Sequence, residues 1–158
     1  QSKEDTWLRV TLPDRALRWI QKGDVTIIPA GTPRPRGSGQ AVVDVARRFL
    51  GVPYLWGGTT AHGIDCSGLA QLSYHLNGVE LLRDADMQFN QPGLQVVARE
   101  DLQTGDLIFF GESSITHVGI YIDDGQFVHS TTHLRPVVQI SSLEEPRWTQ
   151  LYQGARRP

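Results

Sequence analysis

Apolar residues recur with helical spacing in two stretches of the first half of the chain. The first stretch spans residues 40–50 and stops at Gly51; its apolar face holds Ala41, Val42, Val45, Ala46, Phe49 and Leu50. The second begins at Cys66 and carries apolar residues at Leu69, Ala70, Leu72 and Leu76. Residues three and four apart share one face of a helix, so both stretches predict amphipathic helices. Asn77 and Gly78 are typical of a helix C-terminus. A shorter helix is expected at residues 86–90.

The last third of the chain changes to short apolar runs separated by turn residues. A turn at residues 101–106 leads into a buried strand at 107–110. Further strands are expected at 116–122, 126–132 and 137–140. Trp148, Leu151 and Tyr152 are expected to close the sheet. Since the strands follow the helices instead of alternating with them, the order predicts an α+β fold, with helices packed on an antiparallel sheet.

The N-terminal residues have a strand-like pattern of their own. Apolar and polar residues alternate at 7–10 and 17–20, and a third strand is expected at 25–28. Three short strands cannot bury a core alone, so this piece is either part of a β domain or an extension that pairs onto the main sheet. A proline- and glycine-rich stretch follows and predicts an extended linker. We therefore divide the chain into a β segment (1–30), a linker (31–39) and a main domain (40–156).

Composition and charge describe an ordinary globular protein. The 158 residues are 39% hydrophobic and 20% charged, with a net charge of −2. No basic run is longer than the pair Arg156 and Arg157, which argues against a nucleic-acid groove or a polybasic membrane anchor. The longest apolar run, residues 118–122, is too short to span a bilayer. The chain begins with Gln1, so we expect a processed or trimmed product, and its single cysteine excludes an internal disulfide.

That single cysteine, Cys66, lies where a loop becomes a helix. Asp65 is a good N-cap, which makes Cys66 the first helical residue. Free N–H groups and the macrodipole at a helix start favour negative charge. We therefore expect a lowered pKa for the Cys66 thiol and a role as nucleophile. The alternative is a small buried apolar residue, as free cysteines often are.

A nucleophilic cysteine needs a base, and five histidines are available. They are His62, His75, His117, His129 and His133. His75 lies on the opposite side of its helix from Cys66. His117 takes the thiol proton and His129 orients its ring in the relay that we expect. A zinc site formed by Cys66, His117, His129 and His133 is the rival, but the chain has no CxxC or HExxH motif, and residues 130–132 favour a strand. We expect no metal.

Strand register decides whether the two relay histidines can meet. A two-residue turn at 124–125 would place His117 and His129 on opposite faces of the sheet. A three-residue loop at 123–125, a type I turn with Gly125 left-handed in a bulge, would instead put Gly119 opposite His129. His117 then lies on the diagonal, within reach of a ring hydrogen bond, and Gly119 has no side chain to obstruct it. The Asp-Asp-Gly sequence suits this loop, so we predict the bulge.

Five ordered motifs carry a family resemblance. They are PYLWGG at 53–58, DCSGL at 65–69, GDLIFF at 105–110, HVGIY at 117–121 and FVHS at 127–130. In this order and spacing, over residues 40–156, they resemble the NlpC/P60 family, papain-like cysteine peptidases that cut bacterial cell-wall peptides. Residues 1–30 resemble the last strands of a bacterial SH3-like domain. The chain is therefore most similar to γ-D-glutamyl-L-diamino acid endopeptidases of the SH3b–NlpC/P60 type.

The resemblance implies catalytic roles for four matching residues. Cys66 matches the nucleophile, His117 the general base and His129 the orienting residue. Tyr54 matches the tyrosine whose hydroxyl assists the oxyanion hole, beside the backbone N–H of Cys66. Such donors stabilise the oxyanion, and the loss of one typically costs about 10²–10³ in rate.

The resemblance also implies substrate contacts. Trp56 matches a tryptophan that lines the groove, and Asp65 and Ser67 match the pair that holds the free amine of a substrate's N-terminal L-alanine. A carboxylate beside the nucleophile opposes thiolate formation unless a cap or a cation uses its charge. Asp65 is therefore expected to cap the helix with one oxygen and to face an ammonium with the other, although it could be a pure N-cap. Ala85 stands where the resembling subgroup often has a serine.

Together these implications give a functional expectation. The resemblance implies that the chain hydrolyses the γ-D-Glu–diamino acid bond of peptidoglycan stem peptides with a free N-terminal L-Ala, and we expect no cofactor. The alternatives are an amidase or acyltransferase on the same scaffold, or an inactive cell-wall-binding module. We expect a peptidoglycan or muropeptide partner, no nucleic acid or membrane, and a monomer. The expected location is the bacterial cell envelope or outside the cell, with the cytoplasm as the alternative if the chain recycles peptidoglycan.

Overall fold

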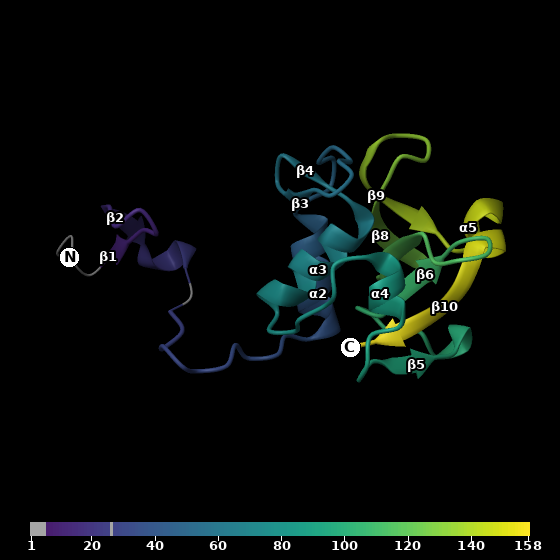
Figure 1. Cartoon of the computed structure of the whole chain (residues 1–158), viewed down its shortest axis with the longest axis horizontal. Coiled ribbons are helices and arrows are strands. Elements are labelled where there is room, and N and C mark those ends of the chain that lie inside the picture. Colours follow the sequence, from purple (N-terminus) through teal and green to yellow (C-terminus); the bar gives the residue numbers. More distant parts are fainter. Residues whose placement is uncertain (1–5, 26) are drawn as a thin grey trace. The chain divides into compact units, whose positions relative to one another are not determined.

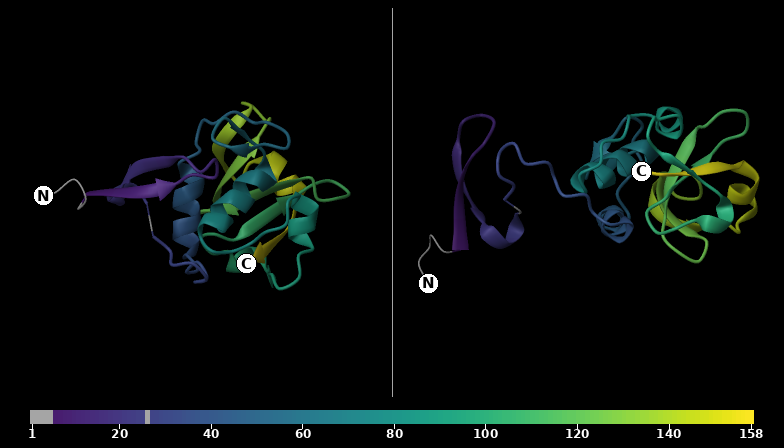
Figure 2. Two further views of the ribbon diagram at one scale, coloured as in Figure 1. Left: turned by 60° about the vertical axis from the view of Figure 1, so that its left-hand side comes forward. Right: turned by 90° about the horizontal axis from the view of Figure 1, so that it is seen from below.

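The computed structural model describes residues 6–25 and 27–158, which fall into two compact units, Gln1–Arg34 and Pro35–Pro158. In the first unit, β1 (Trp7–Thr11) and β2 (Leu17–Gln21) pair as an antiparallel hairpin, followed by the short η1 (Lys22–Asp24) (Figure 2). These two strands form a two-stranded sheet. The third expected strand is wrong: Val25, Ile27 and Ile28 are not in a strand, and Thr26 lies outside the described residues.

The second unit begins with the predicted helices. α2 (Gly39–Arg47) starts where the Ser38 hydroxyl accepts the N–H of Ala41, and α3 (Cys66–Leu76) starts at Asp65. The short α4 (Ala85–Phe89) lies one residue earlier than expected. A small hairpin of β3 (Thr59–Thr60) and β4 (Gly63–Ile64), which the sequence did not predict, precedes α3. In the described part of the chain, no helix has both the length and the apolar character that crossing a bilayer requires.

The main sheet has six strands in the order β5-β10-β6-β7-β8-β9, and each neighbouring pair is antiparallel. The predicted strands are confirmed as β6 (Leu107–Phe110), β7 (His117–Tyr121), β8 (Gln126–Thr131) and β9 (Val137–Ser142). The sequence did not predict β5 (Gln95–Val97) or the short η2 (Arg99–Asp101).

The C-terminal end differs from the expectation. Trp148 and Leu151 belong to a helix, α5 (Pro146–Leu151), because Pro146 is suited to the first helical position. Only Tyr152 belongs to a strand: β10 (Tyr152–Arg157) starts there and lies between β5 and β6. The C-terminal segment therefore joins the sheet as an inner strand, after a helical turn, and the expectation holds for Tyr152 alone.

The sheet separates two apolar clusters. α2 and α3 lie side by side against one face (Figure 1), where Val118 and Ile120 of β7 belong to the larger cluster. Trp148 of α5 packs on the opposite face with Phe110 and Phe127. Successive strand residues point to opposite faces. The odd-numbered residues of β7, which include His117, therefore lie on the α5 side.

Candidate active site

The start of α3 fixes Cys66 in place. Asp65 Oδ1 accepts the backbone N–H of Gly68 at 2.7 Å, so the predicted N-cap is confirmed. Asp65 Oδ2 accepts the N–H of Gly57 at 2.8 Å, which ties the loop that carries Tyr54 and Trp56 to the helix start. A Cβ on Gly68 would lie 2.4 Å from the carbonyl oxygen of Gly58, so only glycine allows the loop to come this close.

The pKa of Cys66 does not follow the expectation from the helix start. Burial raises the pKa of the Cys66 thiol, and the negative charge of Asp65 raises it further. Backbone N–H groups of Val118, Ser67 and Cys66 itself act in the opposite direction, because they hydrogen-bond the sulfur and favour the thiolate, but they do not outweigh burial. The expected lowering of this pKa is therefore wrong, because a helix start that is packed under other elements loses the solvation of the anion.

The β7–β8 connection has the predicted register. Ile120 lies opposite Val128 and Tyr121 opposite Phe127, which continues to Gly119 opposite His129. A Cβ on Gly119 would lie 3.5 Å from the Cβ of His129, so these two backbones are close neighbours. The bulge register is therefore confirmed.

The turn within this connection is of a different type. Both Asp124 (φ +43°) and Gly125 (φ +74°) are left-handed, and Gln126 N–H donates to the Asp123 carbonyl at 2.7 Å. The expected type I turn is therefore wrong, because its central residues have negative φ. Ile122 N–H then donates to the Gln126 carbonyl at 2.8 Å, which supplies the one-residue offset between the strands.

The two histidines form a ring-to-ring hydrogen bond. His117 Nε2 and His129 Nδ1 are 2.8 Å apart, as the register predicted. The ring of His117 stacks on Trp148 at 5.3 Å, and His129 is fully buried against Trp148 and Phe127. Burial lowers the pKa of His117 to about 3, with a smaller effect from the Arg147 charge, and it lowers the pKa of His129 well below its usual value. Both rings are therefore neutral at pH 7.

Ser141 extends this hydrogen-bonded chain. Its hydroxyl lies 3.1 Å from His129 Nε2, and the side chain is buried. Sequence reasoning missed Ser141 because the predicted strand ended at residue 140. In the structure β9 runs to Ser142, and strand alternation places Ser141 on the same face as Gln139, which pairs with His129. A longer strand prediction would have found it.

Cys66 and His117 meet in a cavity of about 180 Å³, which we call the His117 cavity. Both residues line it, together with Tyr54, and the N–H of Val118 beside His117 faces the Cys66 sulfur. With Nε2 bound to His129, the nitrogen that His117 has left for the thiol is Nδ1. Burial raises the pKa of Tyr54, and the next largest effect comes from Cys66, so its hydroxyl belongs to this site and stays protonated at neutral pH.

A second cavity of about 160 Å³, which we call the Asp65 cavity, lies beside the same sulfur. Its lining residues are Tyr54, Trp56, Gly57, Asp65, Cys66, Ser67, Arg83, Asp84, Ala85 and Thr116. Trp56 is 84% exposed, so its ring is open to an incoming molecule. Every residue to which the family resemblance gives a substrate contact therefore lies around one cavity.

Arg83 occupies the place where a substrate ammonium was expected. Its guanidinium contacts Asp65 Oδ2 at 2.6 Å and Oδ1 at 3.0 Å, and it donates to Ser67 Oγ at 2.9 Å. Sequence reasoning missed this pair because Arg83 is 18 residues from Asp65 and has no helical or strand relation to it. The exposed Asp84 is the other carboxylate that lines the Asp65 cavity.

The remaining histidines lie elsewhere. His62 is exposed beside the β3–β4 hairpin, His75 contacts Glu80 at 2.7 Å, and the ring of His133 packs edge-on against Trp148. Across residues 6–25 and 27–158, no group of three or more histidine, cysteine, aspartate or glutamate side chains is arranged to hold a metal ion. His117 and His129 direct ring nitrogens at each other, which a shared zinc ligand set would not allow.

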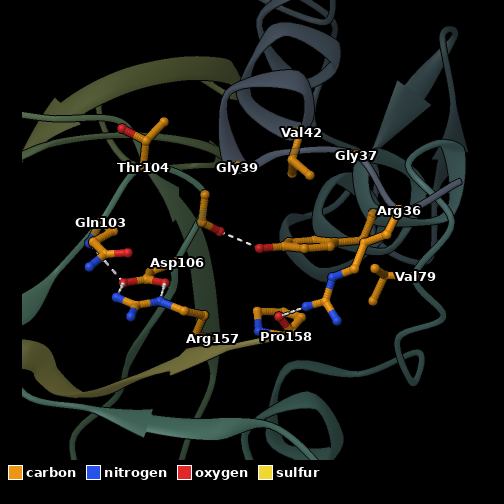
Figure 3. A pocket seen from close by; sticks show the side chains of 12 residues that line it. Arg36, Gly37, Gly39, Val42, Val79, Gln103, Thr104, Asp106, Arg157 and Pro158 are labelled. Atoms are coloured by element: carbon orange, nitrogen blue, oxygen red, sulfur yellow. Dashed lines mark hydrogen bonds and ion pairs between the residues drawn. The ribbon is translucent and has the colours of Figure 1, made fainter.

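Another cavity, shown in Figure 3, contains none of the predicted site residues. Asp106 and Arg157 form a two-point ion pair on one side of it, and the Arg36 guanidinium binds the Pro158 carbonyl on the other. The Tyr74 hydroxyl, which also lines this cavity, donates to the carbonyl of Gly105. These contacts join the segment before α2, the start of β6 and the end of β10.

Comparison with known proteins gives consistent matches. Residues 51–157 match the model of the NlpC/P60 family. The chain is 37% identical to a Bacillus cereus protein named gamma-D-glutamyl-L-lysine dipeptidyl-peptidase, over 99% of this chain and 47% of that protein. It is 42% identical to the Escherichia coli K12 protein named murein DD-endopeptidase MepS/murein LD-carboxypeptidase, over 73% of this chain and 61% of that protein.

A solved structure agrees with these matches. The crystal structure of an NlpC/P60 family protein from Bacillus cereus superposes with a TM-score of 0.89 at 35% identity, covering 99% of this chain and 52% of that one. The chain thus spans about half the length of the first curated relative and of this structure.

Proposed function

Since this chain belongs to the NlpC/P60 family, we propose that it is a cysteine endopeptidase that hydrolyses the γ-D-Glu–diamino acid bond of peptidoglycan stem peptides. The observation that carries the proposal is the Cys66 sulfur at a capped helix start, sharing a cavity with an imidazole whose other nitrogen is held by His129. The names of the relatives, which include a γ-D-glutamyl-L-lysine peptidase and a murein endopeptidase, support the substrate class.

The first half of the reaction forms an acyl-enzyme. The resting pair is a neutral thiol and a neutral imidazole, because burial raises the pKa of Cys66 and lowers that of His117. The thiol proton moves to His117 Nδ1 as the sulfur attacks the γ-carbonyl carbon of D-Glu. The His117 Nε2–H donates to His129 throughout, which keeps the ring oriented. His117 then gives the proton to the leaving amine as the C–N bond breaks, and a thioester remains.

The second half releases the product. Water gives a proton to His117 Nδ1 and attacks the thioester carbon; the C–S bond breaks, the proton passes from His117 to the Cys66 sulfur, and the D-Glu γ-carboxylate is released. In both halves the oxyanion is stabilised by the backbone N–H of Cys66 and by the Tyr54 hydroxyl, which is protonated at neutral pH because its pKa is raised. The chain's own residues supply every proton transfer in this scheme.

The amine of an N-terminal L-Ala would bind in the Asp65 cavity. Asp65 and Ser67 already bind Arg83, so their contribution is to position this arginine. The cavity then contains both a carboxylate and a guanidinium. Asp84 is exposed at the same cavity and adds the carboxylate that an ammonium can pair with. Trp56 provides an open aromatic face for the L-Ala side of the substrate.

The test of the chemistry uses the tripeptide L-Ala-γ-D-Glu-meso-diaminopimelate. We expect release of the dipeptide L-Ala-D-Glu with a new γ-carboxyl group, detected by mass spectrometry, and complete loss of release in Cys66→Ala. No other thiol can replace the missing one in this variant, because Cys66 is the single cysteine of the chain. Cleavage at another bond, or transfer of the acyl group to an added amine in place of water, would favour the amidase or acyltransferase alternative.

Substrate binding without cleavage would favour the wall-binding alternative. Whole sacculi and the free tripeptide are compared at equal stem-peptide concentration, since preference for sacculi indicates action on the intact wall and preference for the tripeptide indicates recycling.

N-acetylation of the L-Ala tests the amine site separately. We expect it to raise KM at least about 10-fold, an effect that Asp84→Asn should reduce. Indifference to acetylation would remove the amine from the proposal.

A further inference from the structure

The two cavities beside Cys66 can each hold a different part of the substrate. Tyr54, Cys66 and Thr116 line both cavities, whereas His117 lines one of them. The leaving amine must lie against the His117 ring, because that ring gives it a proton. The residue that leaves with this amine therefore occupies the His117 cavity, while the acyl part of the substrate extends into the Asp65 cavity.

Arg147 gives the His117 cavity its charge. Among the residues that line this cavity, Arg147 is the one with a formal charge at pH 7, and no carboxylate lines it. Its guanidinium lies 5.5 Å from the centre of the Trp148 ring, and His117 stacks on the same side chain at 5.3 Å. The Arg147 charge reaches the imidazole, since it contributes to the lowered pKa of His117.

The acidic neighbours of Arg147 in sequence are engaged elsewhere. Glu144 contacts Arg99 at 3.5 Å, and Glu145 accepts the backbone N–H of Ser142 at 2.9 Å. In the described part of the chain no ion pair is formed by Arg147. An exposed guanidinium at the wall of a polar cavity is thus available to an anion from solution.

The leaving residue can supply that anion. When the substrate ends at the diamino acid, its α-carboxylate carbon is two bonds from the leaving nitrogen, about 2.5 Å away. A carboxylate this close to the leaving nitrogen must lie in the same cavity as His117. The planar guanidinium of arginine is suited to bind it through two parallel hydrogen bonds.

We propose that Arg147 binds the free α-carboxylate of the leaving diamino acid, so that the chain prefers stem peptides that end at this residue over longer or amidated ones. This inference rests on the proposed function, because it assigns the leaving side of the same reaction. Arg147 acts here as a specificity residue for the leaving group, in a subsite separate from the Asp65 cavity.

The experiment compares L-Ala-γ-D-Glu-L-Lys with its C-terminal carboxamide. We expect the free acid to have a kcat/KM about 10-fold higher in the wild type, because a charge-assisted pair is lost with the amide. Arg147→Gln should lower kcat/KM for the acid about 10-fold more than for the amide, so that the ratio of the two approaches 1, while Arg147→Lys should keep part of the preference. Arg48→Gln, an equal change of charge at an exposed position beyond α2, is the matched control.

Three results would overturn the proposal. They are equal kcat/KM for acid and amide in the wild type, an equal loss on both substrates in Arg147→Gln, and a preference that does not weaken as salt is raised from about 0.05 to about 0.5 M. Any effect of Arg147 on the pKa of His117 acts on both substrates and cancels in the ratio.

A binding measurement separates this proposal from the proposed function. L-lysine and L-lysinamide, the two leaving products, are titrated into the protein and followed by NMR, which needs no turnover. Tighter binding of L-lysine that is lost in Arg147→Gln supports the subsite even if no peptide is cleaved. Equal binding of the two products overturns it even if the peptidase activity is present.

Discussion

At the scale of single residues, the catalytic chain depends on the direction of its hydrogen bonds. For His117 Nδ1 to accept the thiol proton, His117 Nε2 must carry hydrogen and donate to His129 Nδ1. His129 must then carry its proton on Nε2, where the Ser141 hydroxyl is the acceptor, 3.1 Å away. Ser141 therefore provides an acceptor for this tautomer of His129, in which Nδ1 is left to accept from His117.

The first prediction concerns Ser141. Ser141→Ala leaves the buried Nε2–H of His129 without its acceptor, which removes the hydrogen bond that stabilises the productive tautomer. We expect kcat to fall about 10-fold with little change in KM, since a penalty of about 1–3 kcal/mol falls on the reactive form. Ser141→Thr keeps the hydroxyl and should restore most of the rate. Full activity in Ser141→Ala would show that the tautomer is fixed in another way.

The second prediction concerns pH and stability. The pKa of His117 is lowered to about 3 in the folded protein and that of His129 is also lowered, while unfolded histidine titrates near about 6.5. Between these values the unfolded chain binds more protons, so the free energy of unfolding rises with pH. Stability should therefore fall as pH drops below about 6.5, by up to about 1.4 kcal/mol per pH unit for each histidine.

Urea denaturation at pH 7, 6 and 5 measures this slope. His129→Asn removes one of the two titrating groups and keeps a hydrogen-bonding side chain, so the slope of unfolding free energy against pH should decrease by about one proton. An unchanged slope in His129→Asn would mean that His129 is already protonated in the folded protein.

At the scale of elements, the β7–β8 hairpin brings the two histidines together. The third prediction is that Gly119→Ala separates them. The added Cβ would lie 2.5 Å from Cδ2 of Phe127, a ring packed under the His129 imidazole, so the hairpin must shift. We expect a loss of about 1–3 kcal/mol in unfolding free energy. We also expect kcat to fall by a larger factor than the unfolding equilibrium changes, because the two histidines are separated. Gly23→Ala is the control, because a Cβ there meets nothing within 4 Å. Equal behaviour of the two variants would contradict the role of Gly119.

At the scale of the whole molecule, the Pro35–Pro158 unit is closed by an ion pair between distant segments. Asp106 is 2% exposed, and its two carboxylate oxygens accept hydrogen bonds from Arg157 Nε at 2.8 Å and from Arg157 Nη2 at 2.7 Å. It also accepts the N–H of Gln103 at 2.8 Å. The last strand is therefore held to the beginning of β6 (Figure 3), and β6 in turn pairs with β7, the strand of His117.

The fourth prediction follows from this ion pair. Asp106→Ala leaves the Gln103 N–H without its partner and removes the carboxylate that pairs with Arg157, which keeps its bond to the Asp101 carbonyl. We therefore expect a loss of about 2–3 kcal/mol in unfolding free energy, measured in urea. Asp106→Asn should lose less because it keeps an acceptor oxygen. Glu112→Ala, in the exposed β6–β7 loop, is the control and should change stability by less than about 0.5 kcal/mol. Equal losses in Asp106→Ala and the control would mean that the chain end contributes little.

Much of the site could be predicted from local patterns. The Asp65 cap, the start of α3 at Cys66 and the shared face of His117 and His129 depend on residues that are close in sequence or in facing strands. Backbone hydrogen bonding and the two-residue period of strands fix such relations before any packing occurs. The predictions of a third N-terminal strand and of a strand at Trp148 were wrong because a short apolar run is compatible with several local structures. Packing against neighbouring segments decides which of them forms.

The sequence by itself thus determined which residues are the nucleophile and base candidates, and on which elements they lie. Only the tertiary structure decided the charge state of Cys66, the pairing of Asp65 with Arg83, the contact of Ser141 with His129 and the place of Arg147 beside the site. The physical reason is that burial and ion pairing depend on segments brought together from across the chain. No local hydrogen-bond pattern specifies which side chains from these distant segments lie around the sulfur.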